Sequence, residues 1–107
     1  VLGFAFKENC PDMRNTGVLE TVLELREFGV HVDVYDPYVD SAEAEQSYGI
    51  VTAAVPAKAA YDGIILAVAH DDFRNMGVGQ VRAYGKPNSV LFDLKYVFSA
   101  SESDLRL

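Results

Sequence analysis

The 107-residue sequence contains a single cysteine and no long run of apolar residues. One cysteine cannot form an internal disulfide, and no group of Cys and His residues has the spacing of a zinc motif. A membrane-spanning helix needs roughly 18 or more consecutive apolar residues, and no stretch approaches that length. Because half of the residues are hydrophobic, we expect one soluble globular domain. The single cysteine leads us to expect a reducing cytoplasm, and the missing zinc spacing leads us to expect no metal site.

Basic residues are also scarce. Nine Lys and Arg residues stand against sixteen Asp and Glu residues, which gives a formal net charge of −7. This charge repels nucleic acid and anionic membranes, so we expect neither as a partner, and an anionic ligand requires a local basic pocket. The sequence has no initiator methionine and no signal segment, and it begins inside a strand-like run. We therefore expect residues 1–107 to form one domain of a longer protein.

Glycine is absent from the loop in which many α/β proteins hold a phosphate. The stretch AFKENCPDMRNT, residues 5–16, lies between an apolar run and a helical pattern, and no glycine stands between Gly3 and Gly17. The dinucleotide-binding fingerprint G-x-G-x-x-G is therefore missing, and backbone amides alone cannot form the site. Lys7 lies in this loop at the strand end, Arg14 lies just before the helix, and Lys95 ends the last predicted strand, so these cations could attract an anion.

These cations have a second interpretation. They could be surface charges that form ion pairs with nearby carboxylates, namely Glu8, Asp12 or Asp93. Composition alone favours this pairing over ligand binding, because the sequence is rich in acidic residues.

The sequence patterns predict strands that alternate with helices. The predicted strands are residues 1–6, 30–36, 50–53, 63–70 and 89–95. The predicted helices are residues 15–28, capped by Asn15 or Thr16, then 41–48, 55–61, 71–76 and 77–85. This alternation predicts a mainly parallel, five-stranded sheet in a three-layer α/β/α sandwich, a Rossmann-like fold.

Ligands of such sheets gather at the carboxyl ends of the strands, where Lys7, Asp36, His70 and Lys95 are expected. For His70 we predict a hydrogen bond to local backbone, and for Asp36 a turn-capping role. Cys10 lies between two basic residues, but no histidine or carboxylate is placed to act as its base. We therefore predict no catalytic role for Cys10.

Several motifs together resemble a known family. GFAFK, PDMRNT, VYDPYVD and FDLKYVF are similar to the C-terminal, UDP-binding domain of the UDP-glucose/GDP-mannose dehydrogenases. Members of this family use NAD to oxidise the C6 alcohol of a nucleotide sugar to a carboxylate. FKENCPDMRNT with LREFGVHVDVYDP resembles the branch that acts on UDP-N-acetylhexosamines, such as the Vi-antigen and O-antigen enzymes of capsule and surface-polysaccharide biosynthesis. The resemblance implies the strand order 3-2-1-4-5 and a full-length homodimer.

The resemblance also implies roles for individual residues. Phe6 and Lys7 would contact the UDP-sugar, and Lys95, where the glucose branch often has arginine, would also contact the substrate. Arg14 would reach NAD. The family's catalytic cysteine motif, G-x-C-x-P-K-D, does not occur in this sequence, so the resemblance implies no catalytic residue here and a fragment that is inactive alone.

Two other classes of function remain open at this point. A receiver-like or flavodoxin-like signalling module would also place Asp36, Asp71, Asp93 and Lys95 at strand ends, where a receiver binds Mg²⁺ and phosphate. However, Lys7 and Glu8 stand where its first acidic pair belongs. A purely structural oligomerisation domain is the third interpretation.

Overall fold

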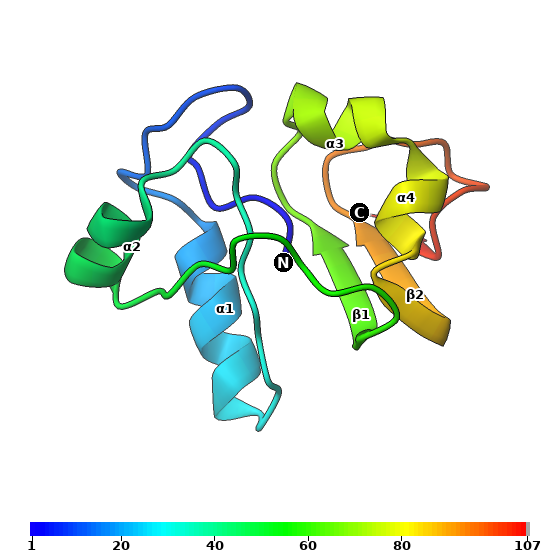
Figure 1. Ribbon diagram of the computed structural model, residues 1–107, viewed down its shortest axis with the longest axis horizontal. Coiled ribbons are helices and arrows are strands. Elements are labelled where there is room, and N and C mark those ends of the chain that lie inside the picture. Colours follow the sequence, from blue (N-terminus) through cyan, green and yellow to red (C-terminus); the bar gives the residue numbers. More distant parts are fainter. Residues whose placement is uncertain (107) are drawn as a thin grey trace.

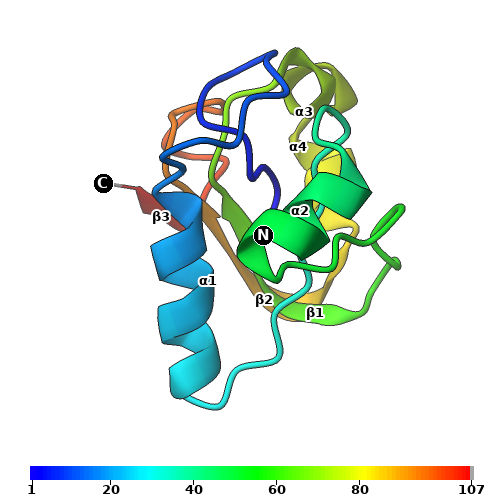
Figure 2. The same cartoon turned by 90° about the vertical axis from the view of Figure 1, so that its left-hand side faces the viewer.

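The computed structural model describes residues 1–106 as an α/β domain. Helices α1 (Val18–Glu27) and α2 (Ser41–Tyr48) lie on one flank of the N-terminal segment, as Figure 1 shows. Strands β1 (Tyr61–Leu66) and β2 (Gly85–Asp93) lie on the other flank with helices α3 (Asp71–Met76) and α4 (Val78–Arg82). The short strand β3 (Leu105–Arg106) is visible at the edge of the sheet in Figure 2.

The sheet has three parallel strands in the order β1-β2-β3. Its register places Leu66 opposite Asp93, so β1 and β2 end at the same edge. Strand β3 was not predicted, and it extends the sheet beyond β2. The chain leading into β3 is held there by Asp104, whose amide donates to the Leu91 carbonyl at 3.0 Å and whose carboxylate accepts from the Leu91 amide at 2.8 Å.

The first three predicted strands are not regular strands, which corrects the prediction. Their backbones form only isolated parallel bridges: Val34 with Thr52, Leu2 with Tyr35, and Leu2 with Leu66. The bridges follow the predicted order, but two local features interrupt the first segment after Leu2. Gly3 has a φ of 101°, and the next amides, of Phe4 and Ala5, donate to the Asp36 carboxylate instead of to a strand carbonyl.

The helix predicted over residues 55–61 is also absent. Ala59 has a φ of 53°, outside the helical region, and its amide donates to the Ala83 carbonyl at 2.9 Å. The amide of Ala60 similarly donates to Tyr84, and Tyr61 already belongs to β1. Contacts with a distant segment have therefore outweighed the helix start that Pro56 suggests.

The other four predicted helices are present. Helix α2 has the predicted bounds and ends at Gly49, whose φ is 69°. Helix α1 begins later than predicted, because neither Asn15 nor Thr16 is its N-cap. Gly17 occupies the N-cap position without a side-chain bond, and the Thr16 hydroxyl accepts a long hydrogen bond of 3.3 Å from the Val18 amide.

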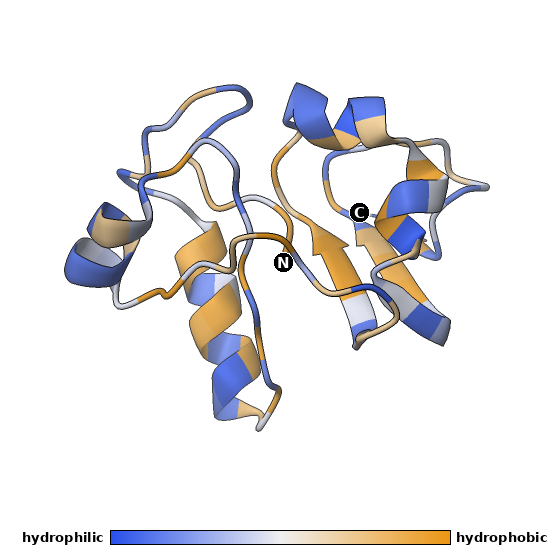
Figure 3. Ribbon diagram, in the orientation of Figure 1, coloured by the Kyte–Doolittle hydropathy of each residue, from blue (hydrophilic) through white to orange (hydrophobic). Residues whose placement is uncertain are grey.

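Two apolar clusters form the core. One contains buried residues of β1, β2, α3 and α4, among them Leu66, Leu91, Phe73 and Val81, and it includes Leu2. The other joins α1 and α2 to the bridge-forming segments, and its buried members are Phe4, Met13, Val22, Val34, Ala44 and Ile50. Figure 3 shows that the C-terminal part of β1 is apolar, whereas its first residues are not. None of the helices within residues 1–106 is long and apolar enough to cross a bilayer.

Candidate functional site

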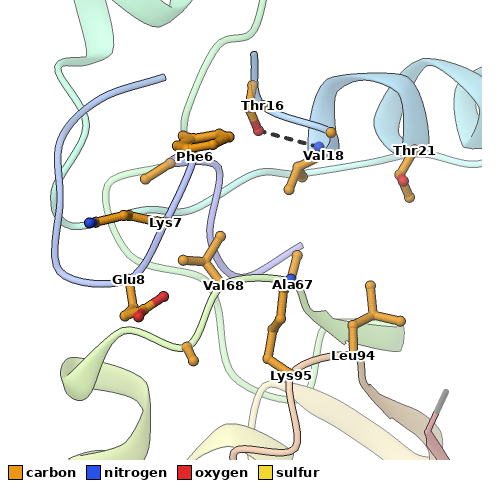
Figure 4. A pocket seen from close by; sticks show the side chains of 13 residues that line it. Phe6, Lys7, Glu8, Thr16, Val18, Thr21, Ala67, Val68, Leu94 and Lys95 are labelled. Carbon is orange, nitrogen blue, oxygen red and sulfur yellow. Dashed lines mark hydrogen bonds between the residues drawn. The ribbon is translucent and has the colours of Figure 1, made fainter. Parts of the chain in front are cut away.

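A pocket of about 450 Å³ lies beyond the carboxyl ends of β1 and β2. Three segments line it: the loop that follows the N-terminal bridge, the start of α1, and the residues just after the two strands (Figure 4). The lining residues are Ala5, Phe6, Lys7, Glu8, Thr16, Gly17, Val18, Thr21, Ala67, Val68, Ala69, Leu94 and Lys95. This is the sheet edge at which the sequence predicts a ligand.

Phe6, Lys7 and Lys95, the predicted substrate-binding residues, all line this pocket. They come from segments almost ninety positions apart in the sequence, and the sheet brings them together. Figure 4 shows the Lys95 side chain pointing toward the α1 side of the pocket, while Lys7 extends away from α1. Within residues 1–106 neither lysine forms an ion pair, so their predicted pairing with Glu8 or Asp93 is absent there.

The start of α1 adds a further positive contribution. Thr16, Gly17 and Val18 line the pocket at the N-terminus of this ten-residue helix, where the helix dipole is positive. Amides of a first helical turn have no partner within the helix and can donate to an anion. Glu8 opposes this attraction, because it is the one acidic residue of the lining. The pocket lining thus combines two lysines and a helix start with one glutamate, and of the two lysine side chains only that of Lys95 is directed toward α1 (Figure 4).

Asp93 fixes the loop that carries Lys95. Its buried carboxylate accepts hydrogen bonds from the backbone amides of Lys95 at 3.2 Å, Val97 at 3.1 Å and Phe98 at 2.8 Å. A carboxylate at the end of a strand can hold a tight turn in this way. Asp93 therefore orients the backbone at Lys95 and leaves the ammonium group to the pocket.

Asp36 performs a similar task on the other side of the pocket. One carboxylate oxygen accepts from the Tyr38 amide at 2.8 Å, which confirms the predicted turn-capping role. The other accepts from the amides of Phe4 and Ala5 and from His70 Nε2, at 2.7, 2.9 and 2.8 Å. Burial alone would raise the pKa of Asp36, but the bonds from His70 and the three amides outweigh it and hold the pKa below its ordinary value.

His70 is fully buried and bridges two segments. Its Nε2 donates to Asp36, and its Nδ1 accepts from the backbone amide of Asn9 at 2.8 Å, which requires a neutral ring. The predicted backbone partner is present, but it lies 61 residues away in the sequence and is not local. Tyr38 stacks on the ring with centroids 4.4 Å apart.

Arg14, the predicted NAD contact, lies outside the pocket lining. Its side chain is 82% exposed and forms a two-pronged ion pair with Asp12, with Nη2–Oδ2 and Nε–Oδ1 distances of 2.9 and 3.0 Å. This pairing lowers the pKa of Asp12 to about 2. For Arg14 the structure therefore shows the ion pair of the second interpretation, and its role toward NAD stays a prediction. Cys10 also lies outside the lining.

Sequence reasoning missed the small and neutral residues of the site. Ala67, Val68 and Ala69 follow β1 and leave room for a ligand, and the hydroxyl-bearing Thr16 and Thr21 lie on the helix side. No charge or motif distinguishes these residues. Their position directly after an apolar run is the one signal that could have identified the first three.

Comparisons with known proteins identify the family of this chain. Residues 1–100 match the model of the UDP-glucose/GDP-mannose dehydrogenase family, UDP binding domain. The chain belongs to this family. It is 52% identical over 107 residues to a UDP-N-acetyl-D-glucosamine 6-dehydrogenase of Pseudomonas aeruginosa, and 48% identical over the same length to that of Salmonella typhi. All of this chain is covered in both cases, but it spans only 25% of the length of each relative.

A solved structure supports the same family. The chain resembles the UDP-D-ManNAc dehydrogenase of Pyrococcus horikoshii with a TM-score of 0.66 and 25% sequence identity. The match covers 92% of this chain and 22% of that protein. The family assignment displaces the signalling-module and purely structural interpretations.

Proposed function

We propose that this family member binds the UDP part of a nucleotide sugar in the pocket beyond β1 and β2, as one domain of an NAD-dependent UDP-N-acetylhexosamine 6-dehydrogenase. The observation that carries the proposal is the convergence of Phe6, Lys7 and Lys95 on one pocket at the start of α1. The ammonium group of Lys95 and a helix N-terminus complement a diphosphate, Lys7 would turn its ammonium group toward the bound ligand, and the half-exposed phenyl ring of Phe6 offers a flat apolar contact.

The sugar specificity and biological setting belong to the same proposal. Two UDP-N-acetyl-D-glucosamine 6-dehydrogenases are 52% and 48% identical to this chain. These identities favour a UDP-acetamido sugar as substrate. By the resemblance, the product would enter surface-polysaccharide synthesis in the cytoplasm, and the whole enzyme would be a homodimer. In this proposal the chain supplies binding and not the reacting groups.

This chain contributes few contacts to NAD in the proposal. The sequence has no Gly-rich dinucleotide fingerprint, and Arg14 lies outside the pocket lining with most of its surface exposed. We place NAD mainly on parts of the enzyme outside these 107 residues, with Arg14 as the contact from this domain. To reach NAD, the guanidinium would exchange its ion pair with Asp12 for the cofactor.

Titration of the 107-residue chain with UDP, followed by NMR, tests the binding site. We expect a dissociation constant of about 1 mM, because a site shared between domains supplies only some of the contacts. Lys7→Ala and Lys95→Ala should each weaken binding roughly ten-fold or more, since a charge-assisted contact is worth about 1.5 to 3 kcal/mol. Shifted amides should include residues 6–8 and 94–96.

Two matched variants control for the loss of positive charge. Lys58→Ala removes an exposed lysine outside the pocket lining, and Arg14→Ala removes the guanidinium paired with Asp12. Both should leave UDP affinity within about two-fold of the parent. If UDP moves no amides around the pocket, or if all four variants weaken binding equally, the pocket is not the UDP site.

A further inference from the structure

We propose that Asn9 and His70 are positioning residues that hold the Lys7 loop, residues 6–12, in its binding conformation. The inference rests on the proposed UDP site. Neither residue lines the pocket, so neither is assigned a contact with the ligand. Each instead fixes the backbone of the loop that carries Lys7, a residue of the pocket lining.

The loop is closed at its base and fastened near its tip. At the base, the Phe6 amide donates to the Asp12 carbonyl at 2.7 Å. Near the tip, Asn9 makes two connections to a segment more than sixty positions away: its amide donates to His70 Nδ1 at 2.8 Å, and its side-chain oxygen accepts from the Asp71 amide at 2.9 Å. Lys7 lies between the base and this second attachment.

The fastening continues into the buried core. His70 Nε2 donates to the same Asp36 oxygen that accepts from the amides of Phe4 and Ala5. One buried carboxylate therefore fixes the strand segment that leads into the loop, and through His70 it also fixes the loop tip. Both side chains have no exposed surface, so the arrangement is shielded from competing water.

The conformation of Asn9 makes it a specific attachment point. Its φ is 57°, in the left-handed region that asparagine and glycine adopt more readily than other residues. Of asparagine and glycine, only asparagine also has a side-chain oxygen that can accept the hydrogen bond from the Asp71 amide. Asn9→Gly thus keeps the backbone conformation and removes the side-chain bond, whereas Asn9→Ala removes the bond and adds backbone strain.

A double-mutant cycle with UDP as the probe tests the inference. In the parent chain, Asn9→Ala should weaken UDP binding three- to ten-fold, and Asn9→Gly by a smaller factor. On the Lys7→Ala background, Asn9→Ala should change the affinity less than two-fold, because it acts through Lys7. His70→Gln should behave like Asn9→Ala, and if that variant fails to fold, the exposed Asn9 still decides the question.

Tyr61→Phe provides the control. It removes the hydrogen bond of 2.7 Å from the Tyr61 hydroxyl to Asp33, at the start of β1, far from the carboxyl ends of the strands. UDP affinity should be unchanged. If Lys7→Ala weakens binding but Asn9→Ala does not, or if Asn9→Ala has the same effect with and without Lys7, the positioning role is overturned. If the parent chain binds no UDP, the proposed function fails, and the inference with it.

Discussion

At the scale of single residues, two buried aspartates build the two sides of the pocket. Asp36 and Asp93 each follow an apolar segment, and each accepts three or more hydrogen bonds, mostly from backbone amides. A buried carboxylate is stable only when such donors compensate for its lost hydration. Neither aspartate needs to contact a ligand. Their effect is to fix the backbones on which Lys7 and Lys95 stand.

Asp36 should make the stability of the domain sensitive to acid. Its pKa in the folded chain lies below its ordinary 3.8, so its contribution is complete above that pH and is lost as pH falls through the folded pKa. Asp36→Asn should lower the free energy of unfolding at neutral pH by roughly 3 kcal/mol. The NH₂ group of the introduced asparagine cannot accept the hydrogen bonds that the N–H donors now give to the carboxylate. The deficit should shrink at acidic pH, as measured by urea unfolding from about pH 7 to about pH 2.

Asp33→Asn is the matched control for this measurement. Asp33 is exposed, and its side chain accepts one hydrogen bond, from Tyr61. Its substitution should change stability by about 0.5 kcal/mol or less at any of these pH values. A deficit of Asp36→Asn that stays constant across the whole acid range would contradict the assigned ionisation.

The sequence supports prediction of part of this residue-scale picture. Asp36 before Pro37 signals a turn cap, and Lys7 and Lys95 are marked by their positions at the ends of apolar runs, whereas Phe6 was singled out only through the family resemblance. The contact between His70 and Asn9 joins residues 61 positions apart, and it depends on how two loops fold over the sheet edge. No local pattern contains that information. Arg14 is different, because its partner Asp12 is only two residues away and was named as a possible partner from the sequence.

At the scale of elements, helices were easier to predict than strands. The glycine that follows α2, Gly49, is a local signal, and the observed bounds of the helix match the prediction. A strand, by contrast, is defined by hydrogen bonds to a neighbour, and residues 1–6 lose those bonds when Phe4 and Ala5 turn to Asp36. Residues 1–6 are apolar as predicted, but the amides of Phe4 and Ala5 bond to Asp36 beside the pocket and not to a neighbouring strand.

Gly3 is the position at which residues 1–6 leave the strand conformation. Its φ is 101°, and a Cβ placed there would lie 2.6 Å from the Val68 Cβ, a carbon of a residue in the pocket lining. Gly3→Ala should therefore lower the free energy of unfolding by about 2 to 4 kcal/mol, from backbone strain and overpacking together. Thermal unfolding monitored by circular dichroism measures the loss.

Gly79→Ala is the contrasting substitution. Gly79 lies within α4, and nothing stands within 4 Å of an added Cβ. Alanine is the better helix former, so this variant should be as stable as the parent or up to about 1 kcal/mol more stable. Equal losses from both substitutions would show that the close contact between Gly3 and Val68 does not determine the result.

At the scale of the whole molecule, the pocket is a small basic region on an acidic protein. The net charge of −7 repels an anion at long range, while Lys7, Lys95 and the start of α1 attract it at short range. In the proposed site, binding depends on placing these groups together, and the parallel arrangement of β1 and β2 brings Lys95 to the edge where the Lys7 loop lies. The sequence reveals the charge and the strand ends, but the volume between them depends on the packing of three separate segments.

The last prediction concerns activity. The 107-residue chain incubated with a UDP-acetamido sugar and NAD should produce no NADH, measured by absorbance at increasing protein concentration. Its one cysteine lies outside the pocket, and no dinucleotide fingerprint is present to bind the cofactor. Because the chain spans 25% of the length of its dehydrogenase relatives, we expect turnover only in the complete enzyme. Cys10→Ser serves as the control: steady NADH production that this substitution abolished would identify Cys10 as a nucleophile and make the binding-only assignment wrong.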